Sequence, residues 1–311
     1  MRRAARRGVS GLIASLALAT LVPAGAAAAG SGQTPSSGDF AGLVALPNGH
    51  RLYLECHGSG SPTVIFEAGL RSRGDIWDWS RAAGAGTGVF PLVTPFTHAC
   101  IYDRPGTLAQ FPDVSRSDPV PMPRSTGEVA SDLHELLEAA GVPAPYVMVG
   151  ASTGGLIVRD YAAVYPWEVS GLVLVDAISE AMEGLMKPSQ FARYNLYYLQ
   201  SPSPDAAQYD VLEAIDFYRS FAEIKPRRRQ ARHTPMVVIS ADYGFGTPAG
   251  VSRHFAGVVN RTWKRGQRYL ASLRPKTKHV IAYGSGHQIH VNEPGLVARY
   301  VLGMVARARG I

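Results

Sequence analysis

One short stretch of the sequence holds a serine in a setting suited to nucleophilic chemistry. The apolar run 146–149 leads into G-A-S-T-G at residues 150–154, and apolar residues then recur at helical spacing until Pro166. This order predicts a strand, a sharp turn with Ser152 at its apex, and a helix. So sharp a turn strains the serine backbone, and the residues two before and two after it must lack side chains, as glycines do. The free N–H groups that begin the helix would lie beside the serine hydroxyl.

The elements around this turn alternate between short apolar strands and amphipathic helices. A capping box at residues 125–128, for example, opens a helix with one apolar face just before the central strand. Strands that are apolar on both faces and alternate with helices predict a mostly parallel sheet covered on both sides. Two earlier strand-like runs, 43–46 and 51–56, are joined by Pro-Asn-Gly at 47–49, which adds antiparallel strands at one edge.

The order of these elements and three motifs together resemble the α/β-hydrolase superfamily over roughly residues 40–309. The motifs are the turn at Ser152, the sequence Y-D-R-P-G at 102–106, and the late G-S-G-H that ends at His287. The resemblance implies a mostly parallel eight-stranded sheet with helices on both faces. It also implies one hydrolase domain over 40–311, in which residues 177–233 form a helical cap between the sixth and seventh strands.

The resemblance implies that Ser152 belongs to a catalytic triad. A serine hydroxyl needs a base that accepts its proton and a third group that orients this base, and the chain order in this fold is serine, acid, histidine. His287 follows the last predicted strand in a glycine-rich segment, and we expect it to be the base. Of the nine histidines, His279 and His290 are its possible rivals.

Two aspartates are candidates for the acid, the third member of the triad. The family usually places it after the seventh strand, where Asp242 stands, but Asp242 comes about two positions early and Gly244 occupies the typical slot. Some members place the acid after the sixth strand, where Asp176 ends the apolar run 171–175. We favour Asp176 and keep Asp242 as the alternative. Asp176 could instead only cap the next helix.

The resemblance also implies an oxyanion hole made of two backbone N–H groups. One belongs to Thr153, directly after the nucleophile, and the other to Leu70, in the loop after the third strand. The family often has His-Gly in this loop, and here Ala68 and Gly69 leave the backbone donor intact. Glu67 precedes them, and the sequence indicates no role for it.

The chain has two cysteines, Cys56 and Cys100. The family's fold places the second strand, which ends at Cys56, beside the fourth strand, which contains Cys100. We therefore expect a disulfide between them, since the N-terminus predicts export and an oxidising compartment permits the bond.

The first 29 residues have the composition of a secretory signal peptide. They begin with four arginines among small residues, run mostly apolar through 9–22, and end in alanines. The alternative is an uncleaved membrane anchor, but Pro23 and Gly25 leave a short apolar core for a span. The Sec and twin-arginine routes both fit. Residues 30–39 predict a flexible tether. We expect a secreted protein without a stable membrane anchor after cleavage.

Charge and motif content point to a small-molecule substrate as the partner. The formal charge is +7, and four of the arginines lie in the predicted signal peptide. The basic cluster 225–229 fits a solvated loop, and no nucleic-acid motif accompanies it. No group of His, Cys and Asp has metal-ligand spacing, so we expect neither a metal nor an organic cofactor. The sequence does not indicate an oligomeric state.

These observations favour a secreted serine hydrolase that cleaves carboxylic esters through an acyl-enzyme intermediate. A serine at position 152 argues against the epoxide-hydrolase and dehalogenase branches, which use a carboxylate there. A peptidase, lactonase or lyase on the same fold is an alternative, and so is a ligand-binding protein with weak turnover. The predicted cap would hold the determinants of substrate choice.

Overall fold

A computed structural model describes residues 38–109, 114–201 and 212–311. The predicted signal peptide, residues 1–29, lies outside the described residues, as does most of the predicted tether, 30–39. All described residues belong to one compact unit, 34–311.

The unit is built on the predicted eight-stranded sheet. The strand order is β1-β2-β6-β3-β7-β8-β9-β10. β2 is antiparallel to both of its neighbours, and every other pairing in this sheet is parallel. The strands are β1 (Phe40–Ala45), β2 (Arg51–His57), β3 (Thr63–Glu67), β6 (Ala99–Tyr102), β7 (Tyr146–Ala151), β8 (Val169–Val175), β9 (Met236–Ala241) and β10 (Lys278–Ala282). A separate two-stranded ribbon pairs β4 (Trp79–Ser80) with β5 (Gly84–Ala85).

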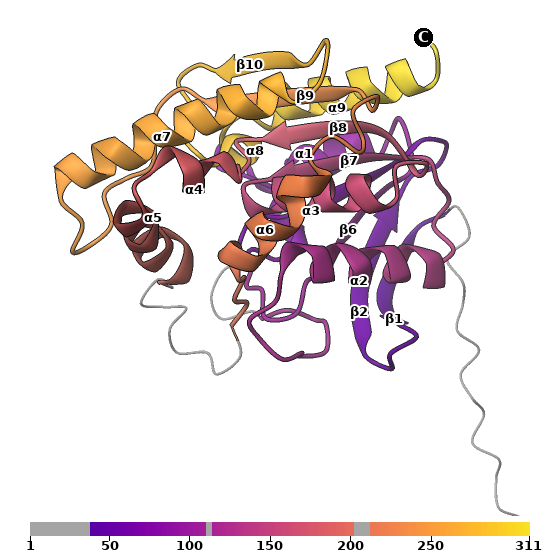
Figure 1. Cartoon of the computed structure of the whole chain (residues 1–311). Coiled ribbons are helices and arrows are strands. Elements are labelled where there is room, and N and C mark those ends of the chain that lie inside the picture. The colour runs from indigo at the N-terminus through magenta and orange to yellow at the C-terminus, as the bar shows by residue number, and fades with distance from the viewer. Residues whose placement is uncertain (1–37, 110–113, 202–211) are drawn as a thin grey trace, which may run out of the picture. The chain divides into compact units, whose positions relative to one another are not determined.

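Helices cover both faces of the sheet because side chains of the central strands alternate between two cores. Met148 of β7 faces the core shared with α2, α3 and α7, whereas Val147 and Val149 face the core shared with α1 and α9. Figure 1 shows these helices around the sheet. All six residues of β7 are buried. The helices of these layers are α1 (Val89–Val93), α2 (Thr126–Ala139), α3 (Thr153–Val164), α7 (Arg253–Ser272) and α9 (Pro294–Ala308), with η1 (Gly74–Asp78) and α8 (Ile289–Asn292) beside them.

The insertion 177–233 between β8 and β9 is helical over much of its described part. Its helix α6 packs against α2 and α3, and its helix α4 packs against α7. Asp216 caps α6, because its carboxylate accepts a hydrogen bond from the Arg219 N–H. No helix in the described part of the chain has the length and hydrophobicity to cross a membrane. The helices of the insertion are α4 (Ala181–Leu185), α5 (Pro188–Tyr194), η2 (Asn195–Gln200) and α6 (Phe217–Arg227).

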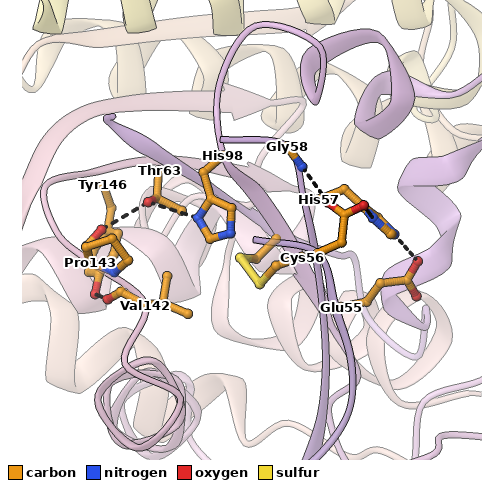
Figure 2. The surroundings of a disulfide bond; sticks show 11 residues. Glu55, Cys56, His57, Gly58, Thr63, His98, Val142, Pro143 and Tyr146 are labelled. Carbon is orange, nitrogen blue, oxygen red and sulfur yellow. Dashed lines mark hydrogen bonds and ion pairs between the residues drawn. A yellow bond between two sulfur atoms is a disulfide. The ribbon is translucent and has the colours of Figure 1, made fainter. Parts of the chain in front are cut away.

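A disulfide joins the two strands that the resemblance had placed side by side. Cys56 of β2 and Cys100 of β6 lie directly opposite each other in the antiparallel register, and their sulfurs are bonded (Figure 2). Both cysteines are fully buried. The bond closes a loop with a sequence separation of 44 residues and so restricts the unfolded chain strongly.

Replacement of both cysteines by alanine should lower the free energy of unfolding by about 3–4 kcal/mol, as expected for a loop of this length. Chemical denaturation of the wild type and of the double variant Cys56→Ala/Cys100→Ala measures this difference. Thiol titration of the unreduced, denatured wild type should find no free thiol, and two titratable thiols would refute the bond.

A second buried feature makes the stability of the fold depend on pH. Asp160 of α3 is fully buried, and among the described residues only one of its two carboxylate oxygens, Oδ2, has a partner, the Thr126 hydroxyl at 2.6 Å. Burial raises the pKa of Asp160 from its ordinary 3.8 to about 7. The folded state therefore holds this proton more tightly than the unfolded state. The resulting stability is complete below about pH 4 and is lost as the pH rises through about 7.

Asp160→Asn should remove this pH dependence. Relative to the wild type, the variant should gain about 2–3 kcal/mol between pH 5 and pH 8, because only the wild type must bury a carboxylate at the higher pH. Urea denaturation of both proteins at the two pH values measures the change. If the free energies of unfolding of the variant and the wild type differ by the same amount at pH 5 and at pH 8, the raised pKa of Asp160 is wrong.

Candidate active site

Ser152 stands at the apex of the predicted strand–turn–helix, between β7 and α3. Its backbone has φ 54° and ψ −118°, a region that residues with side chains rarely occupy. Glycines allow this turn. A Cβ on Gly150 would lie 2.4 Å from the carbonyl oxygen of Gly154, and a Cβ on Gly154 would lie 2.4 Å from that of Glu67. Both glycines are therefore required by the close approach of backbone to backbone.

Asp176 lies at the end of β8, the strand next to β7. The Ser152 N–H donates to the carbonyl of Val175 at 3.0 Å, which ties the turn to the end of β8. The Asp176 carboxylate accepts a hydrogen bond from the Ala241 N–H at 3.0 Å, so β9 holds it in place. Its other oxygen lies 2.7 Å from Nδ1 of His287. The fold thus brings Asp176 and His287 together at the end of β8, the strand beside the one that leads into Ser152.

His287 is held by aromatic rings as well as by Asp176. Its ring centroid lies 4.5 Å from that of Phe245 and 5.5 Å from that of Trp263. The side chain of His287 is 26% exposed and that of Asp176 is 2% exposed, so solvent reaches the imidazole but not the carboxylate. Among the described residues, no hydrogen bond joins Nε2 of His287 to the Ser152 hydroxyl. Catalytic hydrogen bonds of this kind are often long without substrate and shorten when substrate binds.

The residues considered as alternatives for the acid and the base, Asp242, His279 and His290, have other partners. The carboxylate of Asp242 accepts a hydrogen bond from the Gly284 N–H at 3.1 Å and so braces the loop that carries His287. His279 lies 2.7 Å from the Ser240 hydroxyl. The ring of His290 lies 4.8 Å from that of Trp77, tilted by 43°, and burial, with the charge of the neighbouring His287, lowers the pKa of His290 to about 3. In the described part of the chain, neither histidine pairs with an aspartate.

The loop after β3 lies directly against Ser152. A Cβ on Gly69 would be 3.4 Å from Cβ of Ser152. The Leu70 N–H donates to no group in the described residues, and the Thr153 N–H is the first of α3, where no preceding turn supplies an acceptor. The two N–H groups expected to bind an oxyanion are thus both available beside Ser152.

A buried ionic cluster behind this loop was not foreseen from the sequence. Arg104 lies between the carboxylates of Glu67 and Glu213, and the Tyr102 hydroxyl donates to Glu67. All four side chains are at least 97% buried. Burial raises the pKa of Glu67 to about 7, although Arg104 and Tyr102 favour its charged form. Tyr102 and Arg104 belong to the motif 102–106, but nothing local in the sequence indicates that Glu67 and Glu213 face it.

One group of potential metal ligands occurs in the described residues. Cys56, His98 and Cys100 have ligand atoms within 4.8 Å of one another (Figure 2). The disulfide uses both sulfurs, so neither is present as the thiolate that binds a metal. His98 contacts the Thr63 hydroxyl at 3.4 Å, and burial lowers the pKa of this histidine. The group therefore forms part of the packing around the disulfide.

Comparison with known proteins agrees with this fold. A sequence model of the family described as "alpha/beta hydrolase fold" matches residues 103–228. The solved structure of Est816, titled as an N-acyl homoserine lactone degrading enzyme, has a TM-score of 0.60 and 20% identity. The alignment covers 84% of this chain and 99% of that one. The chain thus has the α/β-hydrolase fold, and residues 103–228 match the sequence model of that fold.

Two relatives in sequence show how far the similarity extends. The uncharacterised protein YqjL of Bacillus subtilis is 24% identical over 244 residues, which cover 77% of this chain and 82% of YqjL. An uncharacterised protein of Schizosaccharomyces pombe is 33% identical over 167 residues, but these cover 47% of this chain and only 30% of that protein.

The two aspartates should differ sharply in their effect on activity. Asp176→Asn should lower kcat by a factor on the order of 10⁴, because an amide no longer holds His287 in the required tautomer. Asp242→Asn should cost less than about tenfold, since its amide oxygen can still accept from Gly284. Steady-state hydrolysis of p-nitrophenyl acetate measures both. Similar losses in the two variants would remove the reason to single out Asp176.

Proposed function

We propose that the protein is a secreted serine hydrolase of carboxylic esters. The observation that carries this proposal is the 2.7 Å contact between His287 and Asp176 at the sheet edge where Ser152 is presented. A strained serine, an imidazole oriented by a buried carboxylate, and two free N–H groups are the parts that acyl transfer requires.

In the proposed reaction, the Ser152 hydroxyl attacks the ester carbonyl and His287 accepts its proton through Nε2. Asp176 holds the Nδ1–H side of the ring and stabilises the imidazolium that forms. The N–H groups of Leu70 and Thr153 bind the oxyanion. His287 then protonates the leaving alcohol, and an acyl-enzyme remains. Water, activated by the same histidine, hydrolyses it.

The proposed substrate class is supported by one structural neighbour and by the chemistry of acyl transfer. Est816, which this fold resembles, is titled as a lactone-degrading enzyme, and a lactone is a cyclic ester. Simple esters, lactones, thioesters and amides all pass through an oxyanion, so a substrate panel must rank them. The proposed partner is a small-molecule substrate, and we propose no role for nucleic acid or for a stable membrane anchor.

Export is part of the proposal and has separate support. The disulfide between Cys56 and Cys100 is of a kind that persists in oxidising compartments. In a secreted product, N-terminal sequencing should find the chain starting near residue 30.

A fluorophosphonate probe should label Ser152, because the probe phosphonylates serines activated by a neighbouring base. Ser152→Ala should lose both the label and the hydrolysis of p-nitrophenyl esters. Ser170→Ala is the matched control: it removes a half-buried hydroxyl near the start of β8, away from Asp176 at that strand's end, and should keep both. The labelled residue is identified by peptide mass spectrometry.

If the wild type takes no label and hydrolyses no ester, lactone, thioester or amide of the panel, the hydrolase assignment is wrong. Binding of such compounds without turnover would then favour a ligand-binding protein.

A further inference from the structure

The guanidinium of Arg104 uses all five of its N–H donors inside the protein. Nε and Nη2 bind the two carboxylate oxygens of Glu213 at 2.6 and 3.1 Å, and Nη1 binds a carboxylate oxygen of Glu67. The two remaining donors reach backbone: Nη1 binds the carbonyl of Ala68 at 3.1 Å, and Nη2 binds that of Gly69 at 2.6 Å. An arginine has five such donors, so this side chain is saturated.

The contact to Gly69 fixes the direction of the neighbouring N–H group. The Gly69 carbonyl and the Leu70 N–H belong to one planar trans peptide, in which the C=O and N–H bonds point in opposite directions. With the oxygen held by Arg104, and also by the Ser72 N–H at 3.0 Å, the Leu70 N–H points away from the guanidinium. Gly69 itself lies against Ser152, and this N–H has no partner among the described residues.

Glu213 connects the same loop to the insertion 177–233. Its carboxylate also accepts a hydrogen bond from the Arg71 N–H, next to Leu70. The Arg71 side chain in turn donates to the carbonyl of Glu213 at 3.2 Å and to that of Gln200 at 2.9 Å. Gln200 and Glu213, two residues of the insertion, therefore both bind Arg71 in the loop that carries the proposed oxyanion donor.

A role in stability alone explains this cluster poorly. Ion pairs taken out of water are often no more stable than apolar side chains of similar volume, because desolvation offsets their attraction. An apolar replacement, however, would leave the carbonyl of Ala68 without its Arg104 donor and the carbonyl of Gly69 with the Ser72 N–H alone, at 3.0 Å. The cluster makes physical sense as a device that orients peptide groups.

We propose that Arg104 is a positioning residue that holds the Leu70 N–H in the direction that an oxyanion requires. Because Glu213 of the insertion 177–233 binds Arg104, this orientation also depends on the insertion. The proposal rests on the proposed function, because it assigns the Leu70 N–H to an oxyanion. Arg104 does not touch the substrate. It acts through the peptide between Gly69 and Leu70.

The test uses Arg104→Lys and Glu213→Gln in the full-length protein. A lysine has three donors and no planar fork, and a glutamine offers one acceptor oxygen where Arg104 and Arg71 require two. Each variant should lower kcat for a p-nitrophenyl ester about 10²-fold, the cost of one oxyanion donor, and change KM less than about threefold.

A second readout separates the oxyanion hole from general damage. An ester and its thiono counterpart, in which sulfur replaces the carbonyl oxygen, differ mainly in how well the developing anion fits the donors. The ratio of their kcat/KM values should fall at least about tenfold in both variants, because a loosened hole discriminates less. A purely structural role would lower both rates and leave the ratio unchanged.

The pair Arg159–Glu180 provides a matched control. It is equally buried and doubly hydrogen-bonded, at 2.7 and 2.8 Å, and in the described part of the chain neither side chain forms a hydrogen bond to the loop 68–71. Glu180→Gln removes a buried charge of the same kind and should keep the wild-type kcat and the wild-type ratio. If Arg104→Lys does not fold, Glu213→Gln carries the test, with circular dichroism as the check on folding.

Two failures can be told apart. If Ser152 is labelled by the fluorophosphonate in every variant, while kcat and the thiono ratio stay at wild-type values in Arg104→Lys and Glu213→Gln, the positioning role is wrong and the serine hydrolase stands. If Ser152 is not labelled even in the wild type, the proposed function fails and this inference fails with it.

Discussion

The structure depends on a place where two stretches of backbone approach each other without side chains between them. The turn at Ser152 is strained, and it persists because Gly150 and Gly154 let the start of α3 close onto the end of β7 and onto Glu67. Hydrogen bonds from the turn to β8 hold this geometry on the other side. A hydroxyl is thereby presented at the carboxyl edge of a rigid sheet, where the strain cannot relax without breaking the packing of the core.

Parallel strands explain why the other groups gather at the same edge. Parallel strands all end on one side of the sheet, so the residues that follow β3, β7, β8 and β10 meet there although long stretches of sequence separate them. Asp176 and His287 are separated by 111 positions and still form a hydrogen bond. The loop with Leu70 reaches the same place from β3.

Buried charge has two different consequences in this molecule. In the part of the chain that the structure describes, Asp160 has a single hydrogen-bond donor. Its burial raises its pKa and makes the fold less stable as the carboxyl group ionises. Arg104, by contrast, is surrounded by acceptors that satisfy every donor, two of them carbonyls beside the candidate site. Asp160 lowers the stability of the fold at neutral pH. Arg104 directs two of its hydrogen bonds to backbone carbonyls and so orients their peptide groups.

The sequence by itself determined the elements and the turn at Ser152, because apolar periodicity and glycine spacing act between residues close in the chain. It also led to His287, through the resemblance to a known fold. Only the tertiary structure paired His287 with Asp176 and left Asp242 bound to Gly284, since the reach of a loop depends on which strands are neighbours. The partners of Arg104 were likewise invisible, because two distant segments, 67–69 and the one that carries Glu213, supply them and no local pattern records a contact that forms only on folding.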